Sequence, residues 1–149
     1  MFLVINTTEN KKFTCALIDQ QQIIKQLNSR PKIYKKNNLL KSINNCLRAG
    51  EISLTELNGI VVVNGPANSF SRLRVSLVIA NLLARLLNIP VVGIKATDFV
   101  NLKQLSSWKE KELLNSKKIN QRSKKIIRKI ILPNYGKQPN INLNNHGLN

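Results

Sequence analysis

The sequence predicts an α/β fold in which a strand hairpin leads into alternating helices and parallel strands. Three observations predict it. Several short apolar runs have the length and bounding turn residues of strands, and two longer segments place apolar residues at helical spacing. Their order along the chain is typical of an α/β sheet. The length of 149 residues suits one domain, or one domain with a tail.

The expected strands lie in the first hundred residues. Residues 2–5 and 13–18 are apolar runs joined by a polar turn, which predicts a hairpin, and Ile23-Ile24 is the candidate third strand. Residues 28–36 contain Ser29 and Pro31 and predict a loop. Residues 60–63 and 91–94 are β-branched runs that suit buried, parallel strands.

Two helices are expected, at residues 37–49 and 71–88. The first has one apolar stripe and ends before Gly50, and the second ends before Pro90. The stripe of the first comprises Leu39, Leu40, Ile43, Cys46 and Leu47. The core face expected for the second comprises Ile79, Leu83 and Leu86. Ser53 and Glu56 have the spacing of a capping box for a short helical turn.

The chain changes character after about residue 99. Ten Lys or Arg residues occur between positions 103 and 129, where apolar residues are sparse, and the last residues are rich in Asn, Pro and Gly. We therefore expect an α/β domain at residues 1–99, and a reduced second domain or basic helical arm with an irregular tail at 100–149. The net charge of +17 favours an anionic partner such as RNA, although the composition of an AT-rich genome explains it about equally well.

Catalytic residues are scarce. His146 is the only histidine, Cys15 and Cys46 lie in apolar patterns expected to be core, and the acidic residues are scattered. A histidine-dependent triad or metal site is therefore not expected, and the prediction is a protein that is not an enzyme and holds no metal. Two cysteines suit a reducing cytoplasm better than a disulfide framework.

Residues 64–71 are the best candidate site. They follow an expected buried strand and open a helix, a geometry that can direct backbone N–H groups at a phosphate. They lack the Gly-Lys-Ser/Thr ending of a Walker A loop. The alternative is that Ser69 or Ser71 caps the helix and Phe70 packs beneath it.

The same segment carries a family resemblance. Gly-Pro followed by Ser-Phe-Ser-Arg-Leu-Arg resembles the Gly-Pro-Gly-Ser-Phe-Thr-Gly-Leu-Arg signature of the TsaB (YeaZ) family. Residues 2–8, 52–60 and 86–94 are similar to further family segments in the same order, so that the resemblance covers residues 1–99. The matching signature positions are Gly65, Pro66, Ser69, Phe70, Ser71, Leu73 and Arg74.

The resemblance implies an RNase H-like, actin-like ATPase (ASKHA) half-domain with a mixed sheet. It implies a non-catalytic, cytoplasmic scaffold that pairs with a TsaD-type catalytic subunit to make N6-threonylcarbamoyladenosine (t6A) in ANN-decoding tRNAs. A TsaE-type ATPase, tRNA bound through the complex, and a homodimer when alone are further implied partners. No cofactor is expected, except a nucleotide at the partner interface. The implied interface lies on the two helices and comprises Asn37, Lys41, Asn44, Arg74, Val78, Asn81 and Arg85.

The chain departs from the family pattern at functional positions. Asn6 stands where the family usually has Asp, which removes a carboxylate from a place where related actin-like ATPase folds organise a metal and phosphates. Arg72 replaces a signature glycine, and Ala67-Asn68 occupies the space of one glycine; these two changes argue against close nucleotide approach at this loop. The alternative function is a small basic RNA-binding protein, although only 5% of residues are aromatic and base stacking has little support. The candidate RNA contacts are Lys117, Lys118, Arg122, Lys124, Lys125, Arg128 and Lys129.

Overall fold

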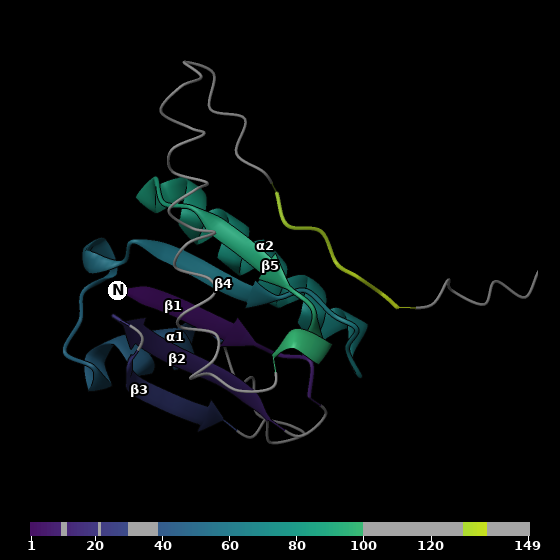
Figure 1. The fold of residues 1–149 in the computed structure, drawn as a ribbon, viewed down its shortest axis with the longest axis horizontal. Helices are drawn as coiled ribbons and strands as arrows, with labels where there is room; N and C mark the ends of the chain where they lie inside the picture. The colour runs from purple at the N-terminus through teal and green to yellow at the C-terminus, as the bar shows by residue number, and fades with distance from the viewer. Residues whose placement is uncertain (10–11, 21, 30–38, 100–129, 137–149) are drawn as a thin grey trace, which may run out of the picture.

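A computed structural model describes residues 1–9, 12–20, 22–29, 39–99 and 130–136. Within these residues, five strands form one mixed sheet in the order β3-β2-β1-β4-β5 (Figure 1). The strands are β1 (Phe2–Asn6), β2 (Phe13–Asp19), β3 (Gln22–Ser29), β4 (Gly59–Val63) and β5 (Val91–Ile94). The expected α/β class, hairpin and parallel strands are therefore confirmed.

The central strand β1 joins the two halves of the sheet. It pairs antiparallel with β2, with Asn6 opposite Thr14, and parallel with β4, with Leu3 opposite Ile60. β5 continues the parallel half beside β4. Because parallel strands end at the same edge, the residues that follow β1, β4 and β5 come together at one edge of the sheet. That edge carries the candidate site.

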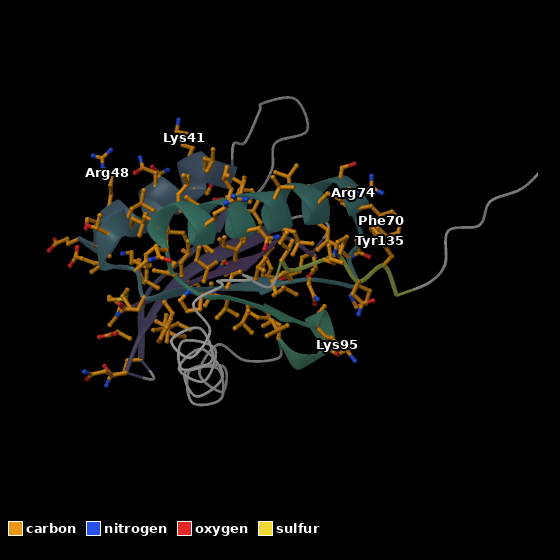
Figure 2. The ribbon with its side chains drawn as sticks, turned by 90° about the horizontal axis from the view of Figure 1, so that it is seen from above. Lys41, Arg48, Phe70, Arg74, Lys95 and Tyr135 are labelled. Carbon is orange, nitrogen blue, oxygen red and sulfur yellow. The ribbon has the colours of Figure 1, made fainter. Side chains whose placement is uncertain are left out.

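Two helices cover one face of the sheet. α1 (Leu39–Ala49) lies against β2 and β3, and α2 (Phe70–Leu87) lies mainly against β4 (Figure 2). The main hydrophobic core fills the space between the helices and this face. Its largest fully buried side chains include Leu3, Ile5, Leu17, Ile60 and Leu73.

The opposite face of the sheet is also apolar and buried. Because side chains alternate along a strand, Val4, Val61 and Val63 point to the face away from α1 and α2, and each is at most 2% exposed. β4 is consequently buried on both faces, as its unbroken β-branched sequence predicts.

The third strand is longer than its sequence indicated. β3 extends to Ser29, so Asn28 and Ser29, expected in a loop, pair with Thr14 and Phe13. The Thr14 hydroxyl also donates a hydrogen bond of 2.8 Å to Asn28 Oδ1. β3 is an edge strand whose alternate residues are exposed. Because of its polar residues, the full length of β3 could not be predicted from apolar runs. Residues 30–36 of the expected loop lie outside the described residues.

The expected core face of α2, Ile79, Leu83 and Leu86, is right only in part. The buried side chains of α2 are Leu73, Ser76, Leu77, Ala80 and Ala84, whereas Leu86 is 72% exposed. Ile79 and Leu83 are only partly buried at the border of the core. Small residues at 76, 80 and 84 let the helix approach the sheet closely, which larger side chains would prevent. Leu40, expected on the core stripe of α1, is likewise 48% exposed.

The end signals around the helices fold largely as expected. The Ser53 N–H donates to Glu56 Oε2 at 2.7 Å, as a capping box requires. The hydrogen bonds from the backbone and then the hydroxyl of Ser53 hold the pKa of Glu56 below its ordinary value. α2 ends at Leu87, and the capping residue that follows, Asn88, has a left-handed φ of 57° two residues before Pro90. Within the described ranges, no helix has the length and hydropathy to cross a bilayer.

Candidate functional site

The loop between β4 and α2 is fixed to the ends of the neighbouring strands. The Asn64 N–H donates to the Ile94 carbonyl at 2.8 Å, and the Ala96 N–H donates to the Gly65 carbonyl at 2.8 Å. On the other side, the Asn68 N–H donates to the Thr8 carbonyl at 3.1 Å. We call residues 64–69 the signature loop. These bonds attach it to the carboxyl ends of both β1 and β5.

The polar residues at the end of β1 are bonded within the protein. Asn6 Oδ1 accepts the Thr8 N–H at 3.0 Å and the Thr8 hydroxyl at 2.7 Å, and Asn6 is 4% exposed. The Thr7 hydroxyl donates to Ser76 Oγ at 2.8 Å, and Ser76 donates to the Leu73 carbonyl at 2.9 Å. This edge of the sheet is thus joined to α2 by buried hydrogen bonds. The role of Ser76 was not predicted, because it stands as one polar residue inside a helical pattern.

Residues 130–136, which we call the return segment, lie against the signature loop. The Asn134 N–H donates to the Asn64 carbonyl at 2.6 Å. Gly65 has a φ of 114°, and a Cβ at this position would meet the Asn134 carbonyl oxygen. Only glycine allows both this backbone conformation and this close approach. At Gly136, an added Cβ would lie 2.9 Å from Pro66 Cβ.

The return segment also contacts the first turns of α2. The Phe70 and Tyr135 rings pack edge to face with centroids 5.3 Å apart. Arg74 Nε donates to the Tyr135 hydroxyl at 2.9 Å, and Figure 2 shows the three side chains together at one end of the helix. The signature residues Gly65, Pro66, Phe70 and Arg74 therefore all touch the return segment.

A third contact lies near the middle of α2. Asn81 Nδ2 donates to the Ile131 carbonyl at 2.9 Å, and Asn81 Oδ1 accepts the Ile131 N–H at 3.0 Å. The Ile131 side chain is 8% exposed and belongs to the main core. It occupies space over Gly93, where an added Cβ would lie 2.5 Å from Ile131 Cγ2.

The predicted helix-cap reading of the signature loop needs correction. Ser69 precedes the helix, but its side chain makes no capping hydrogen bond; its carbonyl accepts the Leu73 N–H at 3.1 Å instead. Ser71 lies inside α2 and is exposed. Phe70, expected to pack beneath the helix, is 53% exposed and packs on Tyr135 instead.

The side of α2 that points away from the sheet carries an apolar stripe. Its residues recur every three or four positions and are 51–72% exposed: Val75, Val78, Leu82 and Leu86. We call these residues the α2 stripe. Only Val78 was among the expected interface residues. The exposure of the other three was not predicted, because α2 is apolar on most sides and Leu86 was assigned to the core.

The remaining interface predictions fall in different places. Arg74 and Asn81 bind the return segment, so each is joined to another part of the chain. Arg85 is exposed on the last turns of α2, and Lys41 and Asn44 are exposed on α1. Asn37 lies outside the described residues. So do His146 and the candidate RNA contacts Lys117, Lys118, Arg122, Lys124, Lys125, Arg128 and Lys129.

Both cysteines are buried free thiols, as expected for core residues. Burial, with a smaller effect of Cys46, raises the pKa of Cys15 to about 12, and burial raises the pKa of Cys46 to about 11. Neither can supply a thiolate near neutral pH. In the part of the chain that the structure describes, no three His, Cys, Asp or Glu side chains are grouped as metal ligands.

Comparison with known protein families identifies the family of this chain. Residues 31–112 match the family model described as TsaD, tRNA N6-adenosine threonylcarbamoyltransferase. The chain belongs to this family. No protein of curated function matches this TsaD-family chain in sequence.

Solved structures show the fold of this family member. YeaZ from Pseudomonas aeruginosa superposes with a TM-score of 0.56 at 19% identity, covering 63% of this chain and 43% of YeaZ. A second structure, described as an uncharacterized protein with similarity to peptidase YEAZ from Pseudomonas aeruginosa, has the same TM-score and identity and is covered over 42%. The chain therefore spans less than half the length of these structures. The expected ASKHA-like fold and the resemblance to YeaZ are confirmed.

Proposed function

We propose that this chain is a TsaB (YeaZ)-type, non-catalytic subunit that pairs with a TsaD-type catalytic subunit in t6A formation on tRNA. The family match, the YeaZ-like fold and the signature residues support this proposal. The observation that carries it is the α2 stripe, an exposed apolar surface that a partner subunit would cover.

The stripe has the properties of a helix-packing surface. Val75, Val78 and Leu82 repeat at helical spacing, so their side chains form one ridge along α2. Large exposed apolar residues grouped on one element mark interaction sites more often than ordinary solvated surface. On α1, the exposed Lys41 and Asn44 offer polar groups for the rim of the same interface. The proposed interface is therefore apolar on α2 and polar on α1.

The residues around the signature loop support a non-catalytic role. Asn6 stands where the TsaB (YeaZ) family usually has Asp, and its side-chain oxygen accepts hydrogen bonds from the N–H and the hydroxyl of Thr8. The signature residues contact the return segment through Gly65, Phe70 and Arg74. These contacts give each residue a role that needs no nucleotide. We accordingly assign substrate chemistry, and any engagement of tRNA or a TsaE-type ATPase, to the cytoplasmic complex.

Calorimetric titration with the TsaD-type subunit from the same source tests the pairing. Val78→Glu and Leu82→Glu each place a carboxylate in the proposed contact, and we expect at least a 100-fold loss of affinity because that charge would be desolvated. Both positions are exposed, so the isolated variants should keep their melting temperature. The control is Leu54→Glu, which changes a 41% exposed leucine in the short turn before β4, outside α2. Wild-type affinity in both stripe variants, or an equal loss in the control, would contradict the assignment.

The stripe is also the surface that we propose for the self-association that the family resemblance implies for the isolated chain. If two copies pair through α2, Leu82→Glu should convert a dimer to a monomer in sedimentation velocity, and Leu54→Glu should not. A dimer that survives Leu82→Glu would have to use another surface.

A further inference from the structure

The return segment runs along the flank of α2 in the opposite direction to the helix. Ile131 contacts Asn81, whereas Tyr135 contacts Arg74 and Phe70, so rising residue numbers in the segment meet falling numbers in the helix. Asn134 lies between these contacts and bonds to the signature loop. The segment is therefore attached at three places, two of them on α2.

We propose that the return segment is a clamp that fixes the signature loop and the first half of α2, and that Gly65, Phe70 and Arg74 serve to hold it. These residues then have a structural role, because what they bind is a segment of the same chain. This proposal gives a role to signature residues that the partner interface leaves without one.

The first turn of α2 has no side-chain cap. The side chain of its N-cap residue Ser69 makes no capping hydrogen bond, although the first N–H groups of a helix have no partners within it. Phe70 is more than half exposed even with Tyr135 against it. Without the return segment, this turn would keep the buried Leu73 side chain and the hydrogen bond from the Thr7 hydroxyl to the Arg72 carbonyl, but it would lose the ring contact at Phe70. The Tyr135 contacts therefore stabilise the end of the helix that lacks a cap.

The second attachment fixes the register of the segment. Ile131 fills the space that Gly93 leaves over β5, and Asn81 bonds to both backbone groups of Ile131. A shift of one residue along the segment would lose this burial and both bonds at once. Because Ile131 is set in place, Tyr135 arrives at Arg74, and the two attachments act together.

The clamp has a consequence for the partner surface, and this step rests on the proposed function. Val75 and Val78 lie between Arg74 and Asn81, the two clamped positions of α2. A helix held at both positions presents these side chains in one orientation before the partner arrives. Preorganised surfaces lose less conformational entropy on binding. Release of the clamp should therefore weaken binding without altering the stripe itself.

Hydrogen exchange on the full chain tests the clamp without any partner. The variant carries Asn81→Leu and Tyr135→Ala, which remove both attachments to α2, and the matched control is Asn45→Leu at an exposed position of α1. We expect the Ile131 N–H to lose protection, and the N–H groups of Asn68 and Leu73 to exchange at least tenfold faster. Amides of β1 and β4 should exchange as in the wild type.

Two results would overturn the proposal. If the Ile131 N–H stays protected in the double variant, Asn81 and Tyr135 do not hold the segment. If it loses protection while Asn68 and Leu73 exchange at wild-type rates, the segment does not fix the loop or the helix. If the double variant fails to fold, the exchange rates of the same N–H groups are measured in Tyr135→Phe, which removes only the hydroxyl bonded to Arg74. We expect Leu73 to exchange about threefold faster in this variant, and no change would count against the clamp.

Titration of the same variants with the TsaD-type subunit tests the coupling. We expect at least a tenfold loss of affinity in the double variant and none in Asn45→Leu. Faster exchange with unchanged affinity would contradict the coupling between the clamp and the partner surface. The pairing with the TsaD-type subunit would still be tested independently by Val78→Glu and Leu82→Glu. The two proposals can thus fail separately.

Discussion

Asn81 binds Ile131 with both ends of its side-chain amide. Nδ2 donates to the Ile131 carbonyl at 2.9 Å and Oδ1 accepts the Ile131 N–H at 3.0 Å. A helical side chain thus pairs with both backbone groups of an extended residue, as a neighbouring strand would. The two residues are fifty positions apart in the sequence, so this contact holds the return segment against α2.

Burial of Ile131 should contribute to stability far more than its neighbour does. Ile131→Ala should lower the free energy of unfolding by about 2–4 kcal/mol, because it removes buried methyl groups and leaves a cavity over Gly93. Leu132→Ala, at a position 71% exposed, should change it by less than about 0.5 kcal/mol. Urea unfolding of the two variants measures the difference. Equal effects would show that the Ile131 side chain is not part of the core in solution.

The buried pair of Thr7 and Ser76 should be energetically coupled. Ser76→Ala leaves the Thr7 hydroxyl only its longer 3.4 Å contact with the Arg72 carbonyl and should cost about 1 kcal/mol of stability. Combining Ser76→Ala with Thr7→Val removes both hydroxyls, so the double variant should be less destabilised than the sum of the single variants. A double-mutant cycle by urea unfolding measures this coupling. Strict additivity would mean that the hydroxyls do not interact.

The two thiols should resist labelling in the native protein. Cys15 and Cys46 are buried, and their pKa values of about 12 and about 11 keep them protonated at neutral pH. Ellman's reagent should therefore label neither thiol at pH 8 until the chain is unfolded in urea. Rapid labelling of either thiol in the folded chain would contradict its burial.

The same thiols should make stability fall in alkali. Unfolded cysteine ionises near 9, so the unfolded state releases protons first as the pH rises. The contribution of the two thiols to stability is complete below pH 9 and decreases between pH 9 and about 11 to 12. Cys15→Ala with Cys46→Ala should flatten this decrease in urea titrations at each pH. An unchanged slope would assign the alkaline loss to other groups.

The basic residues beyond the described part of the chain give a separate prediction. If they contact phosphates of tRNA, binding by the heterodimer should weaken steeply with salt, because neutralised phosphates release counterions. Replacing Lys117, Lys118, Lys124 and Lys125 with Gln should flatten this dependence, measured by filter binding, and leave heterodimer assembly intact. An unchanged slope and affinity would make the charge a matter of composition.

Most of the sheet and helix order could be predicted from local patterns. β4 and β5 are short β-branched runs, and α1 has its core residues Leu39, Ile43 and Leu47 at helical spacing. The unbroken apolar run of β4 reflects burial on both faces of the sheet, and the apolar spacing in α1 reflects burial on one face, so both patterns are visible in the sequence. β3 was underestimated because an edge strand needs few apolar residues.

The candidate site was less predictable because its contacts are distant in sequence. Asn81 reads as a polar residue on a solvated helix face, and no local pattern connects it with Ile131. Gly65 and Arg74 were singled out by the family resemblance, but their contacts with Asn134 and Tyr135 were not foreseen. On α2, Leu86 and Ala84 are both apolar, and periodicity alone could not tell which one faces the sheet. Only the packing of the small residues decides it.

Reconstituted tRNA modification tests the proposed function most directly. A TsaD-type subunit would be supplied with activated threonylcarbamoyl donor and unmodified ANN-decoding tRNA, and t6A would be measured by mass spectrometry of nucleosides. We predict that t6A forms when the wild-type chain or Leu54→Glu is present, and falls at least tenfold when the chain is omitted or replaced by Leu82→Glu. Equal t6A yield with and without the chain, or full activity with Leu82→Glu, would contradict the assignment of this protein as a scaffold subunit that acts through α2.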